Sequence, residues 1–565
     1  MNKKIIGLSI LILLITSCFN NNVNPNSFSQ IDSQNDTITS SSSEYSSNTS
    51  SEEIVSSSES SSEEIISSSE STSESSSSSS SSEDIDEPYK TIEIYASNDI
   101  HGVVLADNSY SAGLGEFGTY FKQKGEEPNT LLIDQGDTWQ GSIYSNYNHG
   151  QLITDVMNYA KFDARTVGNH DFDWGVEYLR NNTARKYNDY ATPVLAGNVY
   201  DYDMSTHTMG NSQQSDLGVK SVTYTLENGL KVGILGGIGY SQITSINSLY
   251  TKDIGFADHI SFIKEEATHL KDDENCDVVI CSIHTGQEDV LNNNLKDYVD
   301  LVLCGHTHKK EYTKEDNLYY VQNSAYMGSF SHITLTYDAE NELVSNTDVS
   351  YISNEELKSS VTQVDYTIYQ LINSYSLECL EAADEVLANS VTGYFGSSES
   401  ANLMAKAIYD EAILEKYDID FSYTNSRKSL GYGSYTYADL YNSFPFDNEV
   451  YIISITGEEI ENEIMCYNNF YHNPSKSTTI KRSQTYKIAC IDYLAFHTNE
   501  NRYYDYFPSI ANADIDKLPT LNNNYRVILK EWLKNNQYSN GTNLDVANYK
   551  SSEANFNKNL FTFID

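Results

Sequence analysis

The chain is poor in basic residues and in long apolar stretches. Its 565 residues include 35 Lys and Arg against 80 Asp and Glu, which gives a net charge of −45 at pH 7. Binding to a nucleic-acid backbone needs clustered positive charge, so nucleic acid is not the expected partner. The one long, mainly apolar run, residues 5–15, is shorter than the roughly 20 residues of a membrane-spanning helix. The sequence therefore excludes a multispanning membrane protein.

The cysteines also lack any recognisable pairing pattern. None of the seven stands in C-x-x-C spacing, so neither a disulfide framework nor a zinc knuckle is indicated. Six of them lie mostly inside apolar runs, which predicts buried thiols. They are Cys276, Cys281, Cys304, Cys379, Cys466 and Cys490.

Residues 1–18 have the form of an export signal. Lys3 and Lys4 precede the apolar run, which leads to the sequence Ile-Thr-Ser-Cys at residues 15–18. These four residues resemble the lipobox of bacterial lipoproteins. The resemblance implies cleavage before Cys18, lipid on that cysteine, and a mature protein anchored to the outer face of the bacterial cell membrane. An ordinary signal peptide that contains a cysteine is the alternative.

Residues 19–88 contain no Lys or Arg up to Pro88, and residues 41–82 are mostly Ser with scattered Glu. Such a segment cannot bury enough apolar surface to offset its chain entropy. We therefore expect a disordered tether that holds the folded body away from the membrane. Low-complexity sequence without a selected length is an equally open interpretation.

From about Lys90, apolar runs of strand length alternate with helical stretches, which predicts an α/β body over residues 89–353. The runs are TIEIYAS, LLI, VGILGGI, VVICSI and LVLCG, and period-two stretches at residues 319–338 predict closing antiparallel strands. Polar residues 200–218 are expected to form a surface insertion. A helical linker is predicted at residues 354–388, followed by a smaller α+β domain at residues 389–565.

Five segments share one pattern, in which an apolar run is followed at once by side chains that can bind a metal. Loops at the carboxyl ends of strands converge in an α/β fold, so these side chains are expected to meet. The segments are SNDIHG with Asp99 and His101, IDQGD with Asp137, TVGNHDFDWG with Asn169, His170 and Asp173, CSIHTG with His284, and LCGHTH with His306 and His308. The remaining histidines lack this context and are interpreted as structural or surface residues: His149, His207, His259, His269, His332, His472 and His497.

Imidazoles and carboxylates in this combination suit a pair of divalent transition ions, such as zinc or manganese. Two such ions can hold the attacking and leaving oxygens of a phosphoryl transfer and can ionise a bridging water. The pattern therefore predicts phosphoester hydrolysis.

The order DxH, GD, GNHD, HxG, GHTH resembles that of the calcineurin-like metallophosphoesterases. The phrases DTWQGS, GNHDFDWG and FPFDNE are similar to the two-domain 5′-nucleotidase branch, and the resemblance covers nearly all of the chain from Lys90 onward. It implies a four-layer β-sandwich flanked by helices, followed by the substrate-binding α+β domain. It also implies hydrolysis of extracellular nucleotides: nucleoside 5′-monophosphates, with di- and triphosphates, nucleotide sugars or 2′,3′-cyclic nucleotides as further substrates.

The resemblance also implies roles for individual residues. One metal would be held by Asp99, His101 and His308, the other by Asn169, His284 and His306, with Asp137 bridging. His170 would stabilise charge on the phosphoryl oxygens or leaving group, oriented and kept protonated by Asp173. Asp171 stands where the branch usually has Glu.

In the second domain the resemblance implies that Asn425 and Arg427 contact the ribose and phosphate side and that Phe446 and Tyr493 stack on the base. Two departures affect this pocket. The family's Asn-x-Gly-Gly-x-Arg loop is contracted to residues 425–427, and its Gly-Gly-Asp-Gly stretch reads HTNENRYY, with Asn499 near the acidic position. A metal-dependent phosphoesterase for a non-nucleotide substrate, and a surface receptor or adhesin with vestigial catalysis, therefore remain alternatives.

Overall fold

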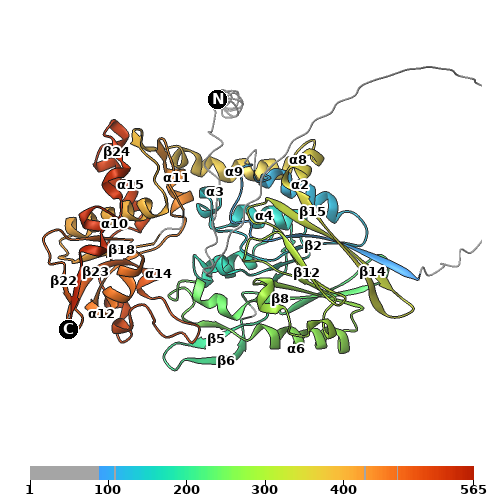
Figure 1. Ribbon diagram of the computed structural model, residues 1–565. Helices are drawn as coiled ribbons and strands as arrows, with labels where there is room; N and C mark the ends of the chain where they lie inside the picture. The colour runs from blue at the N-terminus through green and yellow to red at the C-terminus, as the bar shows by residue number, and fades with distance from the viewer. Residues whose placement is uncertain (1–87, 107–109, 215, 426–427, 468) are drawn as a thin grey trace, which may run out of the picture. The chain divides into compact units, whose positions relative to one another are not determined.

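The computed structural model describes residues 88–565, except 107–109, 215, 426–427 and 468 (Figure 1). The predicted export signal, Cys18, nearly all of the tether and Arg427 lie outside the described residues. Within the described part, no helix combines the length and the apolar character needed to cross a bilayer.

Two six-stranded sheets form the body of the first domain. In the first sheet the four strands β1 to β4 run parallel, and β14 pairs antiparallel with β1 at Tyr89–Ser97. The strand order is β15 (Leu343–Ser353), β14 (Ser329–Asp338), β1 (Tyr89–Ser97), β2 (Thr130–Asp134), β3 (Ala164–Thr166) and β4 (Val194–Leu195).

The second sheet has four parallel strands between two antiparallel edge strands, β12 and β7. Its order is β12 (Glu311–Glu315), β13 (Leu318–Gln322), β11 (Leu301–Leu303), β10 (Val278–His284), β8 (Lys231–Ile238) and β7 (Ser221–Thr225). All five apolar runs that the sequence analysis singled out are strands of these sheets.

The two sheets pack face to face, with helices on both outer faces. Alternate residues of the strands, such as Ile94 and Ile133 from the first sheet and Ile234 and Ile280 from the second, form the core between them. Helices α2 (Leu114–Gly125) and α4 (Gln151–Ala160) cover the first sheet, and α6 (His259–Asp272) covers the second (Figure 1). Helix α9 (Tyr366–Ala383) packs on α2 and α4. The predicted four-layer α/β architecture is confirmed.

The polar insertion at residues 200–218 contains more regular structure than its sequence suggested. Strands β5 (Val199–Asp203) and β6 (Thr208–Gln213) form an antiparallel hairpin, and β5 also pairs with β9 (Ile254–Phe256). Most of its side chains are partly or fully exposed, which explains why no hydrophobic alternation marks the strands.

After the first domain come α8 (Asn354–Ser360), α9 and β16 (Val386–Ala388), within the predicted helical linker. The main sheet of the later residues is mixed and has the order β20 (Val450–Thr456), β23 (Thr485–Ile491), β18 (Phe421–Tyr423) and β21 (Phe470–His472). Helices α10 (Ser397–Leu414) and α15 (Tyr525–Asn535) pack on the same hydrophobic core. The six cysteines of the described part are buried except Cys466, which is exposed, so the prediction of burial is wrong there. Cys466 follows the irregular helical turn at Ile460–Ile464 and faces away from the core.

Candidate metal centre

Seven predicted metal-binding side chains come from strand ends of both sheets. Asp99 and His101 follow β1, Asp137 follows β2, and Asn169 follows β3. In the second sheet, His284 is the last residue of β10, and His306 and His308 follow β11, its neighbour. Because these strands are parallel within each sheet, their carboxyl ends share one edge, as the sequence predicted.

The backbone at this edge is in an unusual conformation. The angle φ is positive at five of the seven residues: Asp99 (50°), His101 (50°), Asp137 (54°), His306 (73°) and His308 (61°). A left-handed backbone costs a non-glycine residue roughly 1–2 kcal/mol. Strained backbone gathered at one edge in this way is typical of a functional site.

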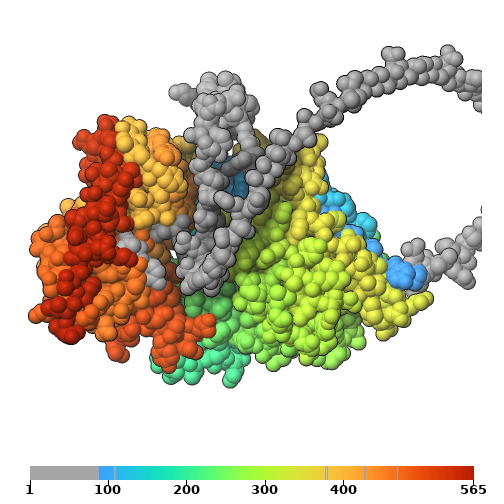
Figure 2. Space-filling model, viewed as in Figure 1, coloured from blue at the N-terminus to red at the C-terminus, as the bar shows by residue number. Residues whose placement is uncertain are grey.

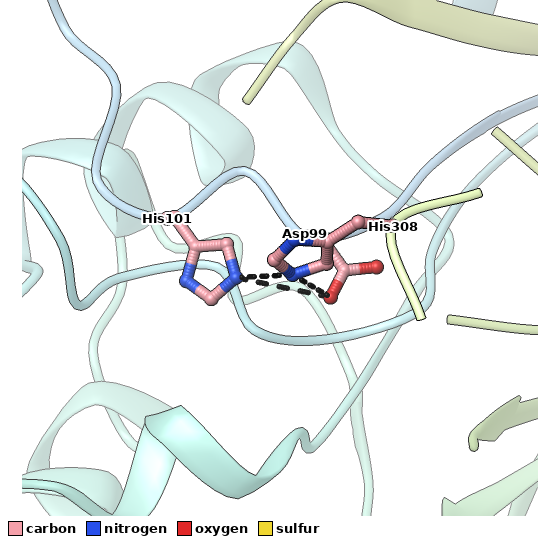
Figure 3. Close-up of side chains that lie close together, drawn as sticks. All are labelled: Asp99, His101 and His308. Atoms are coloured by element: carbon pink, nitrogen blue, oxygen red, sulfur yellow. Dashed lines mark hydrogen bonds and ion pairs between the residues drawn. The ribbon is translucent and has the colours of Figure 1, made fainter. Parts of the chain in front are cut away.

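The first cluster of side chains consists of Asp99, His101 and His308, drawn in Figure 3. The Nε2 atoms of the two histidines lie 2.9 Å apart, and His308 Nε2 lies 3.3 Å from Asp99 Oδ1. His101 Nε2 is 3.9 Å from the same carboxylate oxygen. Two imidazole nitrogens and one carboxylate oxygen thus converge on one point, the arrangement that a divalent ion requires.

The second cluster consists of Asp137, His284 and His306, with Asn169 against both histidines. Asn169 Oδ1 lies 3.2 Å from His284 Nε2 and 2.9 Å from His306 Nδ1. Asp137 Oδ2 is 3.2 Å from His284 Nε2 and 3.8 Å from His101 Nε2 of the first cluster. One carboxylate therefore reaches both clusters.

Backbone carbonyls fix the orientation of two of these rings. His284 Nδ1 lies 2.7 Å from the Gln135 carbonyl oxygen, and His101 Nδ1 lies 3.2 Å from that of Gln140. A carbonyl can only accept a hydrogen bond, so Nδ1 carries a proton in each ring and Nε2 is the nitrogen that faces the cluster. The donor set and its orientation fit a pair of metal ions.

The electrostatics of the clusters are those of a cation site. Burial and the neighbouring His308 lower the pKa of His101 to about 3, and burial with His284 nearby lowers the pKa of His306 to about 4. Burial also favours neutral His284, but Asp137 and Asp99 outweigh it and raise its pKa to about 10. The carboxylates thus attract positive charge to a place where two imidazoles stay neutral and able to bind metal.

His170 is the one histidine of the five motifs that pairs with a carboxylate outside the clusters. Its Nδ1 lies 2.7 Å from Asp173 Oδ2, and its backbone N–H donates to Asp137 Oδ1 at 2.7 Å. Burial opposes its charged form, but Asp173 and Asp137 outweigh burial and raise the pKa of His170 to about 9. At neutral pH the ring therefore carries a proton on both nitrogens. Asp173 accepts the proton on Nδ1, and the proton on Nε2 is not held by Asp173.

The sequence analysis did not assign a role to the residues that support the clusters. Asp171, which was left outside the ligand set, accepts hydrogen bonds from the backbone N–H groups of Thr138 and Gly168 and lies 3.5 Å from Arg165. The Arg165 guanidinium in turn stacks over the Trp139 ring at 3.9 Å. The only sequence mark of this support was a lone arginine, Arg165, two residues before the VGNHD motif begins. Through its contacts with Asp171 and Trp139, Arg165 ties the loops after β2 and β3 together.

The predicted substrate residues of the second domain lie in different surroundings. The Phe446 ring stacks on that of His170, with 5.7 Å between the ring centres and 22° between the planes. The Tyr493 ring lies edge-on to His497 at 5.8 Å, and Asn425 is half-buried beside Thr424. Arg427 lies outside the described residues.

Comparison with known proteins agrees with this fold and site. Residues 92–310 match the family model of the calcineurin-like phosphoesterases, and residues 381–474 match that of the 5′-nucleotidase C-terminal domain. An apyrase of Tabanus yao is 23% identical over 382 residues, which are 60% of this chain and 65% of that protein. The 5′-nucleotidase of Mus musculus is 33% identical over 192 residues, 33% of this chain and 31% of the relative. The chain thus aligns with less than two thirds of the length of each of these relatives.

Solved structures share the fold at low identity. A 5′-nucleotidase precursor from Thermus thermophilus has a TM-score of 0.61 and 14% identity, covering 79% of this chain and 96% of its own. A 5′-nucleotidase from Candida albicans has a TM-score of 0.53 and 15% identity, and the match covers 79% of this chain and 98% of that structure's chain.

Two packed sheets whose strand ends gather two groups of side chains that could hold metal ions are consistent with a metallophosphoesterase. The chain belongs to the calcineurin-like metallophosphoesterases, and within them to the proteins that carry a 5′-nucleotidase C-terminal domain.

Proposed function

We propose that the protein is a metal-dependent phosphohydrolase that removes phosphate from extracellular nucleotides, chiefly nucleoside 5′-monophosphates. The observation that carries this proposal is the position of Asp137, whose Oδ2 lies within 4 Å of a histidine nitrogen in each cluster. A carboxylate shared by two buried nitrogen–oxygen clusters is what a dinuclear hydrolase requires.

The seven side chains would hold two divalent ions of the zinc or manganese type. Asp99, His101 and His308 would bind one, and Asn169, His284 and His306 the other, with Asp137 between them. When bound, the ions would supply Lewis acidity and a hydroxide-like nucleophile at neutral pH.

His170 would act on the substrate directly. Asp173 holds Nδ1, so the ring presents Nε2–H to a phosphoryl oxygen or to the leaving oxygen. The raised pKa keeps this proton in place at neutral pH, and the backbone bond to Asp137 Oδ1 fixes the distance between His170 and the bridging carboxylate.

The second domain would bind the nucleoside through Asn425, Arg427, Phe446 and Tyr493. The proposed boundaries are those expected from the sequence: an export signal at 1–18, a tether at 19–88, the metal-binding domain at 89–353, a linker at 354–388 and the substrate domain at 389–565. A lipid on Cys18 would anchor the protein to the outside of the bacterial cell membrane.

Phosphate release by the full chain tests the proposal. The substrates are AMP, ATP, UDP-glucose, a 2′,3′-cyclic nucleotide and an aryl phosphate, each with Mn²⁺ or Zn²⁺ and after chelation. We expect turnover that favours AMP and that chelation abolishes, because the reaction has no nucleophile without the ions. Turnover of the aryl phosphate alone would support a non-nucleotide substrate, and inactivity of metal-loaded protein would support the receptor alternative.

The role of Phe446 is tested by Phe446→Ala. Stacking on a base contributes roughly 1–3 kcal/mol, so the KM for AMP should rise about 5- to 150-fold. The aryl phosphate, which carries no base, is the matched control, and its KM should change little. An equal effect on both substrates would contradict base stacking and would show that Phe446 serves only to pack His170.

A further inference from the structure

Helix α9 has a second apolar face, which points away from the core. Its inner face packs on α2 and α4 through the fully buried Ile368, beside the partly buried Leu371 and Ile372. On the opposite side, four large side chains are exposed to solvent, and we call them the α9 stripe: Tyr366 (73% exposed), Tyr369 (46%), Leu377 (55%) and Leu380 (40%). The helix lies along the upper edge of the view in Figure 1, and Figure 2 shows surface of the same yellow range at that edge.

The composition of α9 is unusual for a helix at the surface. Its 18 residues include only two charged ones, Glu378 and Glu381. Helix α6, which also has an exposed outer face, includes five Asp, Glu or Lys among 14 residues. A helix with one face in water normally carries its charged residues there, whereas a helix that is apolar on all sides is typically covered on all sides. The α9 stripe therefore has the character of a contact surface.

The spacing of the stripe identifies what covers it. Tyr366 and Tyr369 precede Asn373 by seven and four residues, and Leu377 and Leu380 follow it by four and seven. A two-fold axis at Asn373 therefore exchanges the two halves of the stripe. In an antiparallel second copy of α9, Tyr369 lies opposite Leu377 and Tyr366 opposite Leu380. Such self-complementarity is what an isologous dimer contact requires.

Asn373 supplies a polar group at the centre of the stripe. Its side chain is half-buried, and its Nδ2 donates to the Tyr369 carbonyl oxygen at 2.9 Å. An amide nitrogen carries two protons, so the second one can be donated to the Asn373 Oδ1 of the second copy, and the same bond can form in return. A single polar residue in an apolar seam fixes the register of two helices, because a shifted register would bury the amide against apolar side chains.

The size of the stripe sets the strength of the contact. With about 200 Å² for each whole side chain, the exposed fractions amount to roughly 400 Å² per chain. Two copies would bury about 800 Å² through the stripe, which is below the roughly 1,200 Å² of a stable interface and typical of a transient one. The net charge of −45 on each chain adds repulsion. The contact is therefore weak and reversible.

We propose that the α9 stripe binds the α9 stripe of a second copy of this chain, antiparallel and with the two-fold axis at Asn373. This interface goes beyond the proposed hydrolytic function, and it uses none of the seven metal-binding side chains. It also predicts that added salt strengthens the dimer, since screening reduces the repulsion between the two acidic chains and leaves the apolar contact in place.

Sedimentation velocity of the full chain over a range of concentrations tests the interface. We expect a reversible shift from monomer to dimer as the concentration rises. Tyr369→Lys and Leu377→Glu should each weaken dimerisation about tenfold or more, because each places a charge against an apolar side chain. Leu414→Glu is the matched control: Leu414 is 70% exposed at the end of α10, outside the stripe, so its dimer should keep its affinity.

The double variant with Tyr369→Lys and Leu377→Glu in one chain tests the antiparallel register. In this register each introduced lysine faces the introduced glutamate of the second copy, so the dimer should be stronger than in either single variant. A parallel arrangement would set the two lysines against each other and would show no recovery. Thermal unfolding by circular dichroism checks that the variants fold, as expected from exposed positions.

Four results would overturn the interface. They are a monomer at every concentration, equal dimerisation in Leu377→Glu and Leu414→Glu, no recovery in the double variant, or a monomer that binds phosphatidylcholine vesicles and loses this binding in Leu377→Glu. The last result would assign the stripe to a lipid surface instead. Phosphate release from AMP is measured on the same preparations, so failure of hydrolysis and failure of dimerisation are told apart.

Discussion

Asp137→Asn is expected to abolish hydrolysis and to lower the bound metal from about two ions per chain to one or none. Asp137 is 1% exposed, and its Oδ2 is the oxygen that reaches histidines of both clusters. An amide keeps the shape but loses the negative charge that favours cations at both positions. Loss of several kcal/mol of transition-state stabilisation corresponds to a fall in kcat/KM of about a thousandfold or more.

The measurement is metal content by elemental analysis together with phosphate release from AMP. Asp163→Asn is the matched control, because Asp163 precedes β3 at the opposite end of the same sheet and accepts the Leu132 N–H at 2.8 Å, a bond that an amide oxygen can also accept. The control should keep both ions and its activity. Full metal content and normal turnover in Asp137→Asn would contradict the bridging role.

His170→Ala should reduce kcat by about 10²- to 10⁴-fold while the metal content stays unchanged. A positioned proton donor contributes a factor of this size, and none of the metal-binding atoms belongs to the His170 ring. A fall in kcat without a loss of metal separates a catalytic role of His170 from a role in metal binding.

His149→Ala provides the control for the loss of an imidazole. Its ring stacks on Tyr178 at 4.1 Å and belongs to neither cluster, so kcat should be close to that of the unaltered protein. Loss of metal in His170→Ala, or an unchanged kcat, would be incompatible with the proposed role of His170. Asp173→Asn should give a smaller fall than His170→Ala, because the ring remains while its charged partner is lost.

The strand-end motifs were predictable because each carries its own chemistry in a few consecutive residues. An apolar strand followed by Asp-x-His or His-x-His marks both the element and its candidate metal-binding side chains, as at Asp99 and His308. By contrast, nothing local marks Arg165, whose contacts with Asp171 and Trp139 join strand β3 to the loops after β2 and β3. The β5–β6 hairpin was missed because its exposed strands show no hydrophobic alternation.

The sequence by itself determined the α/β alternation, the residue types of the metal centre and the order in which they occur, since period and motif are local properties of the chain. The family resemblance implied that Asp137 bridges, and the tertiary structure places its Oδ2 near a histidine of each cluster. Only the tertiary structure decided that Phe446 stacks on His170. These relations depend on which strand ends and loops meet in space, and that follows from the packing of whole sheets rather than from any short segment.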